Sequence, residues 1–168
     1  MWNRSIFGPI AAVALFVFLI DRFSKIWVVE IMDLRSLGRI SVLDPFLTFQ
    51  MAWNEGINFG LLDFGDAGKW VLIAVAVVIV AALLWWMRGR SGWLAAIGAG
   101  LVTGGALGNV WDRVEYGAVA DFLNMSCCGV RNPFSFNIAD AAIFLGVVLL
   151  FFLPQDESGD HGDDANRA

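Results

Sequence analysis

Hydrophobic residues of this chain gather in four long blocks that are mostly free of charged residues. Residues 70–87 contain no polar side chain, and their number is close to the roughly 20 residues with which a helix crosses the hydrocarbon core of a bilayer. The other blocks lie at residues 6–26, 93–110 and 138–153. The pattern predicts a mainly α membrane protein with four transmembrane helices.

The first block also has the outline of a secretory signal peptide, because Arg4 precedes an apolar core. No small-residue cleavage site follows this core, and the apolar run continues directly into Asp21 and Lys25. We therefore favour an uncleaved first span that continues as a helix past Asp21.

The segment between the first two predicted spans, residues 36–68, is expected to lie outside the membrane. Within residues 47–53, Leu, Phe, Met and Trp alternate with Thr, Gln and Ala, a period of two that is typical of a half-exposed strand. Gly56 and Gly60 follow and permit tight turns. We expect a small extracytoplasmic β-sheet that lies over the membrane surface and holds or covers an extended ligand.

Glycines in the third block predict how the helices pack. Gly100, Gly104 and Gly108 recur every four residues. Such a small-residue stripe lets helix backbones approach closely in lipid, where burial of apolar surface gives no drive for association. We expect this stripe to hold the end of the third span against another helix.

Composition agrees with a membrane environment and limits the number of domains. Of the 168 residues, 58% are hydrophobic and 16% charged, whereas a typical soluble domain carries about a quarter charged residues. We predict one integral membrane domain at residues 1–153. Residues 154–168 hold much of the net charge of −5 and are predicted to form an acidic, disordered, cytoplasmic tail. The sequence has no basic cluster that indicates binding to nucleic acid.

Four spans that alternate in direction bring the polar residues at their ends to one membrane face. The end of the first span, the start of the second, the end of the third and the start of the fourth all lie on that face. The loop between the third and fourth spans lies there as well. These segments contain Asp21, Lys25, Lys69, Asn109 to Arg113, Asp121 and Asp140.

The orientation of the spans is indicated by two arginines in a short turn. The face opposite the polar cluster has the tight Arg88-Gly-Arg90 turn and both termini. A simple count of Lys and Arg favours the reverse orientation, but several of the counted cations lie beside acidic residues. We therefore predict cytoplasmic N- and C-termini from the turn.

Several kinds of catalytic chemistry are excluded by the residues present. The only histidine, His161, lies in the tail, which excludes Ser-His-Asp triads, Cys-His pairs and an H-E-x-x-H zinc site. Cys127 and Cys128 are adjacent and lack the spacing of metal ligands, so we interpret them as structural or incidental. Ser24 would point away from its direct neighbour Lys25 on a helix. We predict no metal site.

Carboxylates at the ends of apolar spans carry the remaining chemistry. Such groups are costly in a membrane and are usually functional, which favours a functional interpretation of Asp121 and Asp140. Two facing aspartates share a proton, so that one activates water and the other polarises a carbonyl group. This is peptide hydrolysis of the aspartic type.

Other interpretations of the acidic residues stay open at this point. Asp21 and Asp112 are as well explained by ion pairs with Arg22, Lys25 or Arg113 that tie helix ends together. A proton- or ion-coupled transporter or binding protein would also use intramembrane Asp and Lys, although the acids cluster at one face and leave no path across. A purely structural subunit would leave the acids unexplained.

Five motifs, taken together and in order, closely resemble those of lipoprotein signal peptidase, the bacterial signal peptidase II family. They extend from the first predicted span to the fourth. The motifs are D-x-x-x-K from Asp21 to Lys25, N-x-G-x-x-F-G from Asn54 to Gly60, G-G-x-x-G-N-x-x-D-R from Gly104 to Arg113, A-D-F around Asp121 and F-N-x-A-D ending at Asp140.

The resemblance implies an aspartyl endopeptidase that cuts a prolipoprotein on the N-terminal side of its diacylglyceryl-modified cysteine. It implies that Asp121 and Asp140 are the catalytic pair. It also implies roles in binding substrate for Asn54, Asn109 and Arg113, roles in supporting the site for Asp21, Lys25 and Asp112, and an orienting role for Asn137. Two further motif positions are Gly56 and Ala139.

The same resemblance implies a protein of the bacterial inner membrane with its active site near the outer face. The implied partners are a lipidated prolipoprotein and membrane lipid, and we expect a monomer that needs no metal or organic cofactor. Ile57, Asn58 and Ala120 depart from residues that are common in the family. These departures bear on substrate range more than on activity.

Overall fold

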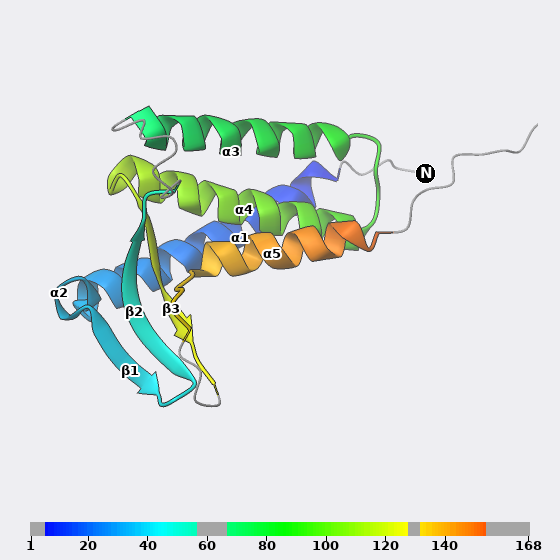
Figure 1. Cartoon of the computed structure of the whole chain (residues 1–168). Coiled ribbons are helices and arrows are strands. Elements are labelled where there is room, and N and C mark those ends of the chain that lie inside the picture. Colours follow the sequence, from blue (N-terminus) through cyan, green and yellow to red (C-terminus); the bar gives the residue numbers. More distant parts are fainter. Residues whose placement is uncertain (1–5, 57–66, 128–131, 154–168) are drawn as a thin grey trace, which may run out of the picture.

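The computed structural model describes residues 6–56, 67–127 and 132–153. Four long helices lie side by side, and a small sheet extends from one end of this bundle (Figure 1). The elements, in chain order, are α1 (Phe7–Lys25), the π-helical segment η1 (Ile26–Ile31), α2 (Leu34–Leu37), β1 (Arg39–Leu43), β2 (Leu47–Asn54), α3 (Ala67–Trp86), α4 (Trp93–Glu115), β3 (Val119–Met125) and α5 (Ile138–Phe151).

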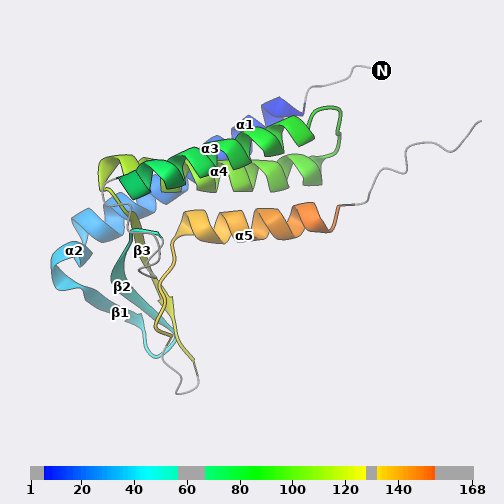
Figure 2. The same ribbon diagram turned by 45° about the horizontal axis from the view of Figure 1, so that its top comes forward.

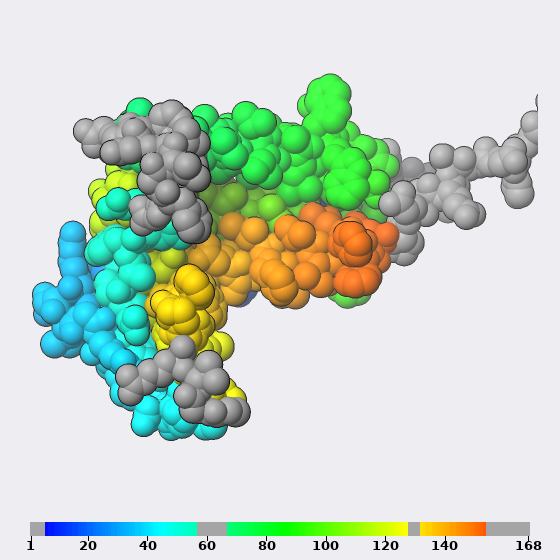
Figure 3. All heavy atoms as spheres, in the orientation of Figure 1, coloured from blue at the N-terminus to red at the C-terminus, as the bar shows by residue number. Residues whose placement is uncertain are grey.

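The long helices alternate in direction along the bundle. α1 and α4 end beside the sheet and α3 and α5 begin there, whereas the first residues of α1 and the last residues of α5 lie at the opposite end (Figures 1 and 2). The space-filling view shows the sheet projecting from the end of the bundle at which α1 and α4 finish and α3 and α5 begin (Figure 3). The helix ends that were predicted to lie on one membrane face therefore converge at one end of the molecule.

Glycines allow α4 to lie in close contact with both α1 and α5. A β-carbon added at Gly104 would lie 2.8 Å from the Cβ atom of Val17 in α1. One added at Gly98, on another side of α4, would lie 2.9 Å from the Cγ atom of Leu150 in α5. These distances leave no room for a side chain, so the small-residue stripe is a packing surface, as predicted.

The outer surface of the bundle is apolar. No residue of α3 is buried, and Phe16, Val78 and Phe144 on three different helices are 65%, 66% and 72% exposed. Helices satisfy their own backbone hydrogen bonds, so an apolar outer surface of this kind is suited to lipid. Among the described residues, α3 and α4 are long and apolar enough to cross a membrane, and α5 is a shorter apolar helix.

The predicted strand at residues 47–53 is confirmed as β2, which pairs with β1 on one side and with β3 on the other in an antiparallel sheet. The prediction that the sheet lies within residues 36–68 is incomplete, because β3 comes from the connection between α4 and α5. β3 has no exposed residue between Val119 and Phe122, where all four residues are buried, so it lacks the period of two that marks a half-exposed strand. Val29 and Leu34 pack with Ala120 and Phe122 in one cluster.

The observed boundaries change the location of two groups of predicted residues. α4 continues to Glu115, so Asn109, Asp112 and Arg113 lie within its last turns and not beyond its end. The first helix continues past Asp21, as predicted, and passes into η1. Predictions about Gly60, Cys128 and the tail concern residues outside those described.

Candidate active site

The sheet and the bundle each supply one aspartate to the site. Asp121 was predicted to lie in a loop, but it lies in β3 opposite Ala52 of β2. It is 3% exposed. Asp140 is the third residue of α5 and is half-buried. The two carboxyl groups interact electrostatically, and both contact Asn137. The structure therefore brings together the pair that the sequence predicted.

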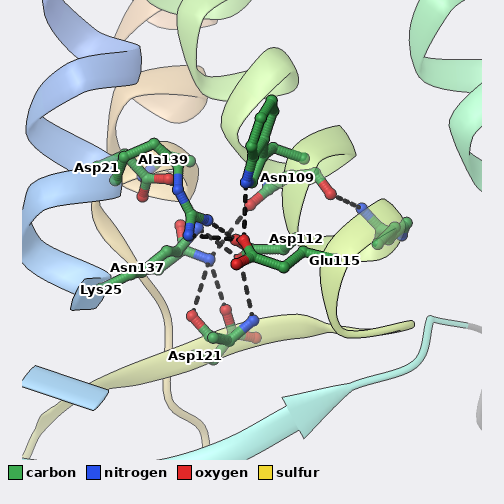
Figure 4. Close-up of polar contacts among 12 residues, drawn as sticks. Asp21, Lys25, Asn109, Asp112, Glu115, Asp121, Asn137 and Ala139 are labelled. Carbon is green, nitrogen blue, oxygen red and sulfur yellow. Dashed lines mark hydrogen bonds and ion pairs between the residues drawn. The ribbon is translucent and has the colours of Figure 1, made fainter. Parts of the chain in front are cut away.

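Asn137, the N-cap of α5, contacts both aspartates, and its contact with Asp121 is shown in Figure 4. Its side-chain oxygen accepts the backbone N–H of Asp140 at 2.8 Å, and Asp140 accepts the backbone N–H of Asn137 at 3.3 Å. This reciprocal capping box satisfies two N–H groups at the helix start. The Asn137 amide nitrogen also donates to Asp121 Oδ1 at 2.7 Å. One fully buried side chain thus sets the position of both carboxylates.

Two further asparagines donate hydrogen bonds to the pair. Asn109 Nδ2 lies 2.8 Å from Asp140 Oδ1, and Asn54 Nδ2 lies 3.1 Å from Asp121 Oδ2. The side-chain oxygen of Asn54 accepts the backbone N–H of Gly56 at 3.0 Å, which ties the end of β2 to this contact. Each carboxylate consequently receives two N–H donors, and both are held from more than one element.

The environment of Asp121 favours its protonated form. Burial, and next the charge of Asp140, raise the pKa of Asp121 from 3.8 to about 7, against the lowering effect of the hydrogen bonds from Asn54 and Asn137. A carboxyl group with this pKa retains a proton near neutral pH in a large fraction of molecules. The pair can therefore hold one acid and one base at the same time.

A buried ion network lies beside the pair. Lys25 Nζ lies 2.7 Å from Asp21 Oδ2 and 2.7 Å from Asp112 Oδ2. Asp21 thus pairs with Lys25 within α1, as one interpretation of the sequence held. Asp112 pairs with Lys25 and Arg22 of α1, and not with its neighbour Arg113, and so ties α4 to α1. Among the described residues, no group of three or more His, Cys, Asp or Glu side chains is arranged to hold a metal ion.

The same ion network holds the backbone next to both candidate catalytic residues. Asp21 Oδ1 accepts the N–H of Ala139 at 3.0 Å, and Asp112 Oδ2 accepts the N–H of Ala120 at 3.1 Å. These two alanines directly precede Asp140 and Asp121. Asp21 and Asp112 therefore position the backbone that carries the candidate catalytic aspartates.

The arginines in the site do not pair with the acidic residues that adjoin them in the sequence. Arg22 pairs with Asp112 and Glu115, whereas the sequence suggested Asp21, because adjacent residues of a helix point in different directions. Arg113 Nη1 donates to the carbonyl oxygen of Asn109 at 3.1 Å. Glu115 has no signal in the sequence that would separate it from an ordinary surface acid, so sequence reasoning missed it.

Comparisons with known proteins agree with this geometry. The family model of signal peptidase II matches residues 13–153. A relative from Methylorubrum extorquens named lipoprotein signal peptidase is 42% identical over 77% of this chain and 75% of its own length, and one of the same name from Caulobacter vibrioides is 36% identical over 89% and 90%.

Solved structures show the same fold. One, described as a bacterial membrane enzyme determined by the in meso method at 1.9 Å resolution, is 28% identical and covers 86% of this chain and 90% of its own, with a TM-score of 0.73. The sequence matches, the shared fold and the paired aspartates lead to one assignment. The chain belongs to the signal peptidase II family, whose members are aspartic endopeptidases.

Proposed function

We propose that this protein removes signal peptides from prolipoproteins by cutting on the N-terminal side of a diacylglyceryl-modified cysteine. Its membership of the family supports this substrate class. The single observation that carries the chemistry is that Asn137 holds Asp121 and Asp140 together at the sheet end of the bundle, where their carboxyl groups interact electrostatically. A lipidated substrate anchored in the membrane would present its cleavage site at this end of the bundle.

In the proposed mechanism, Asp121 holds the shared proton and Asp140 activates water. The support is that Asp121 is the more buried of the two and has a raised pKa, whereas Asp140 lies in the first turn of α5, where the helix dipole favours a negative charge. Asp140 takes a proton from water as it attacks the scissile carbonyl carbon, while Asp121 donates a hydrogen bond to the developing oxyanion.

Three motif side chains near the pair, Asn54, Asn109 and Arg113, are proposed to bind the substrate, and Asn137 is proposed to orient Asp140. Asn54, Asn109 and Asn137 contact the two carboxylates, and Arg113 reaches the backbone of Asn109. Lys25, Asp21 and Asp112 are proposed to support the site, because the two aspartates accept the N–H groups of the alanines that precede the catalytic pair. One chain supplies both aspartates and two N–H donors to each of them, so we propose that a monomer is the active unit.

A further candidate for the same acids is a proton-coupled transporter, and one assay separates the two functions. Purified protein is incubated with a lipidated precursor and with the same precursor lacking the lipid. We expect shortening of the lipidated form alone, seen by gel shift and by mass spectrometry of the released signal peptide. Intact precursor under conditions where the protein is folded would exclude the peptidase.

Turnover is predicted to decrease as pH rises through about 7, because the pair then loses the proton that Asp121 holds. The Asn54 hydrogen bond lowers the pKa of Asp121, so Asn54→Ala should move this alkaline limb to higher pH. The measurement is kcat against pH for both proteins. A limb that moves to lower pH, or does not move, would contradict the assignment of the proton to Asp121.

We propose that residues 1–153 form one membrane domain whose four helices all span the bilayer, with both termini in the cytoplasm and the site near the outer face. The alternating helix directions and the apolar outer surface support this topology. In a Cys127→Ser/Cys128→Ser background, a cysteine at Ser158 should react with a membrane-impermeant maleimide only after the inner membrane is permeabilised. Labelling of intact spheroplasts would reverse the orientation.

A further inference from the structure

Arg22 of α1 is a buried cation to which the proposed mechanism gives no role. It is 9% exposed. Its Nη1 atom donates to Asp112 Oδ1, and its Nη2 atom donates to Glu115 Oε2 at 2.9 Å. The centre of the guanidinium lies 5.9 Å from the ring centroids of both Trp111 and Tyr116. A planar group with fixed donors on two carboxylates and two flanking rings is held in one orientation.

The two oxygens of Asp112 have different partners. Oδ1 accepts from Arg22, whereas Oδ2 contacts Lys25 Nζ at 2.7 Å and accepts the Ala120 N–H at 3.1 Å. Asp112 is fully buried. Loss of the bond to Oδ1 would leave a buried carboxylate oxygen without this donor. The carboxylate would then be held at Oδ2 alone and could rotate about this contact, away from Ala120.

The ladder between β2 and β3 is irregular next to Asp121, although Ala120 itself pairs with Trp53. The pairing of β2 with β3 changes register between Phe49 and Ala52, and the pair Ala52–Asp121 comes directly after this irregularity. A bulge interrupts the regular ladder of hydrogen bonds and bends the strand. Asp112 adds a contact from α4 to the backbone beside this irregularity, at the Ala120 N–H.

We propose that Arg22 is a positioning residue for Asp121. It orients the Asp112 carboxylate, which in turn holds the Ala120 amide and the strand that carries Asp121. The inference rests on the proposed function for its catalytic consequence, but its structural step is independent of that function. Lys25 holds Asp112 at the other oxygen, so the two cations have separate tasks on one carboxylate.

The test compares wild type with Arg22→Gln in detergent. Hydrogen exchange is followed in peptides that cover residues 117–123, and kcat and KM are measured on a lipidated precursor. Arg22→Gln should accelerate exchange at Ala120 and lower kcat about tenfold to hundredfold, a cost typical of a small displacement of a reacting group. KM and exchange in the peptides of α5 should stay at wild-type values, because Arg22 has no described contact there.

Two control variants separate positioning from general packing. Arg35 also pairs with a carboxylate, Glu30, and lies over the ring of Trp53, but it has no described contact with Asp112. Arg35→Gln should therefore change neither exchange at Ala120 nor kcat. Arg22→Lys retains the charge and should restore part of kcat, because an ammonium group can contact Asp112 but lacks the fork that binds two carboxylates.

Three outcomes would overturn the inference: unchanged exchange at Ala120 in Arg22→Gln, unchanged kcat, or faster exchange throughout α1 and α4 with a matching loss of thermal stability. The last outcome would assign Arg22 to folding alone. A wild-type protein that does not cut the precursor would refute the proposed function, and the exchange measurement would still decide whether Arg22 holds Ala120.

Discussion

Replacement of either Asp121 or Asp140 by asparagine is expected to abolish precursor cleavage, lowering kcat on the order of 10³-fold or more. Asparagine has nearly the size of aspartate but neither accepts a proton from water nor shares one with its neighbour. The remaining contacts that hold the pair, from Asn54, Asn109 and Asn137, do not require an ionisable partner. Each variant should therefore fold and still bind the lipidated precursor.

The double variant should lose little beyond either single variant, because two groups that act as a unit are not additive. Asp33→Asn is a suitable control, since Asp33 is an exposed aspartate outside the site. Activity is measured as precursor shortening and binding as retention of the precursor on immobilised enzyme. Appreciable cleavage by a verified, folded single variant would refute the dyad and favour the transporter.

Asp121→Asn also has a predicted effect on stability. The pKa of Asp121 in the folded protein lies above its ordinary value of 3.8, so the folded state binds more protons than the unfolded state between those two values. The stabilisation from this group is therefore present at low pH and is lost as pH rises to about 7. At pH 8 the variant should unfold at the same temperature as wild type or higher, despite its loss of activity.

The second large effect is expected from Asn137→Asp, which should lower kcat about a hundredfold or more. The change replaces an N–H donor 2.7 Å from Asp121 Oδ1 with a third carboxylate. Repulsion would raise the pKa of Asp121 further and turn its carboxyl group away from Asp140. The helix start should persist, because aspartate is as good an N-cap as asparagine.

Asn137→Ser provides the matched control for this prediction. Serine keeps the N-cap function but lacks the amide that reaches Asp121, so a smaller loss of kcat, about tenfold, is expected for one missing hydrogen bond. Circular dichroism should show the same helix content in both variants. If Asn137→Asp cuts the precursor as fast as wild type, Asn137 does not control the ionisation of the pair.

Local sequence patterns determined most of the helices and one strand. Apolar runs of helical length predicted α3, α4 and α5 to within a few residues, because in lipid only a helix or a closed barrel satisfies its own backbone. The alternation at residues 47–53 predicted β2, and Phe49, Met51 and Trp53 of this strand pack against one buried cluster. β3 was missed because both of its faces are covered between Val119 and Phe122, which removes the period of two.

The sequence by itself also determined which acids belong to the candidate site. Asp121 and Asp140 stood out because a carboxylate beside apolar spans is costly, and the motif order resembled one family. Only the tertiary structure decided their partners. The bonds of Asp112 to Ala120 and of Asp21 to Ala139 join residues 8 and 118 positions apart. Arg22 likewise selects Asp112, 90 positions away, over its neighbour Asp21. The physical reason is that the position of a residue along its helix sets the direction of its side chain, whereas the packing of the helices decides which partner lies in that direction.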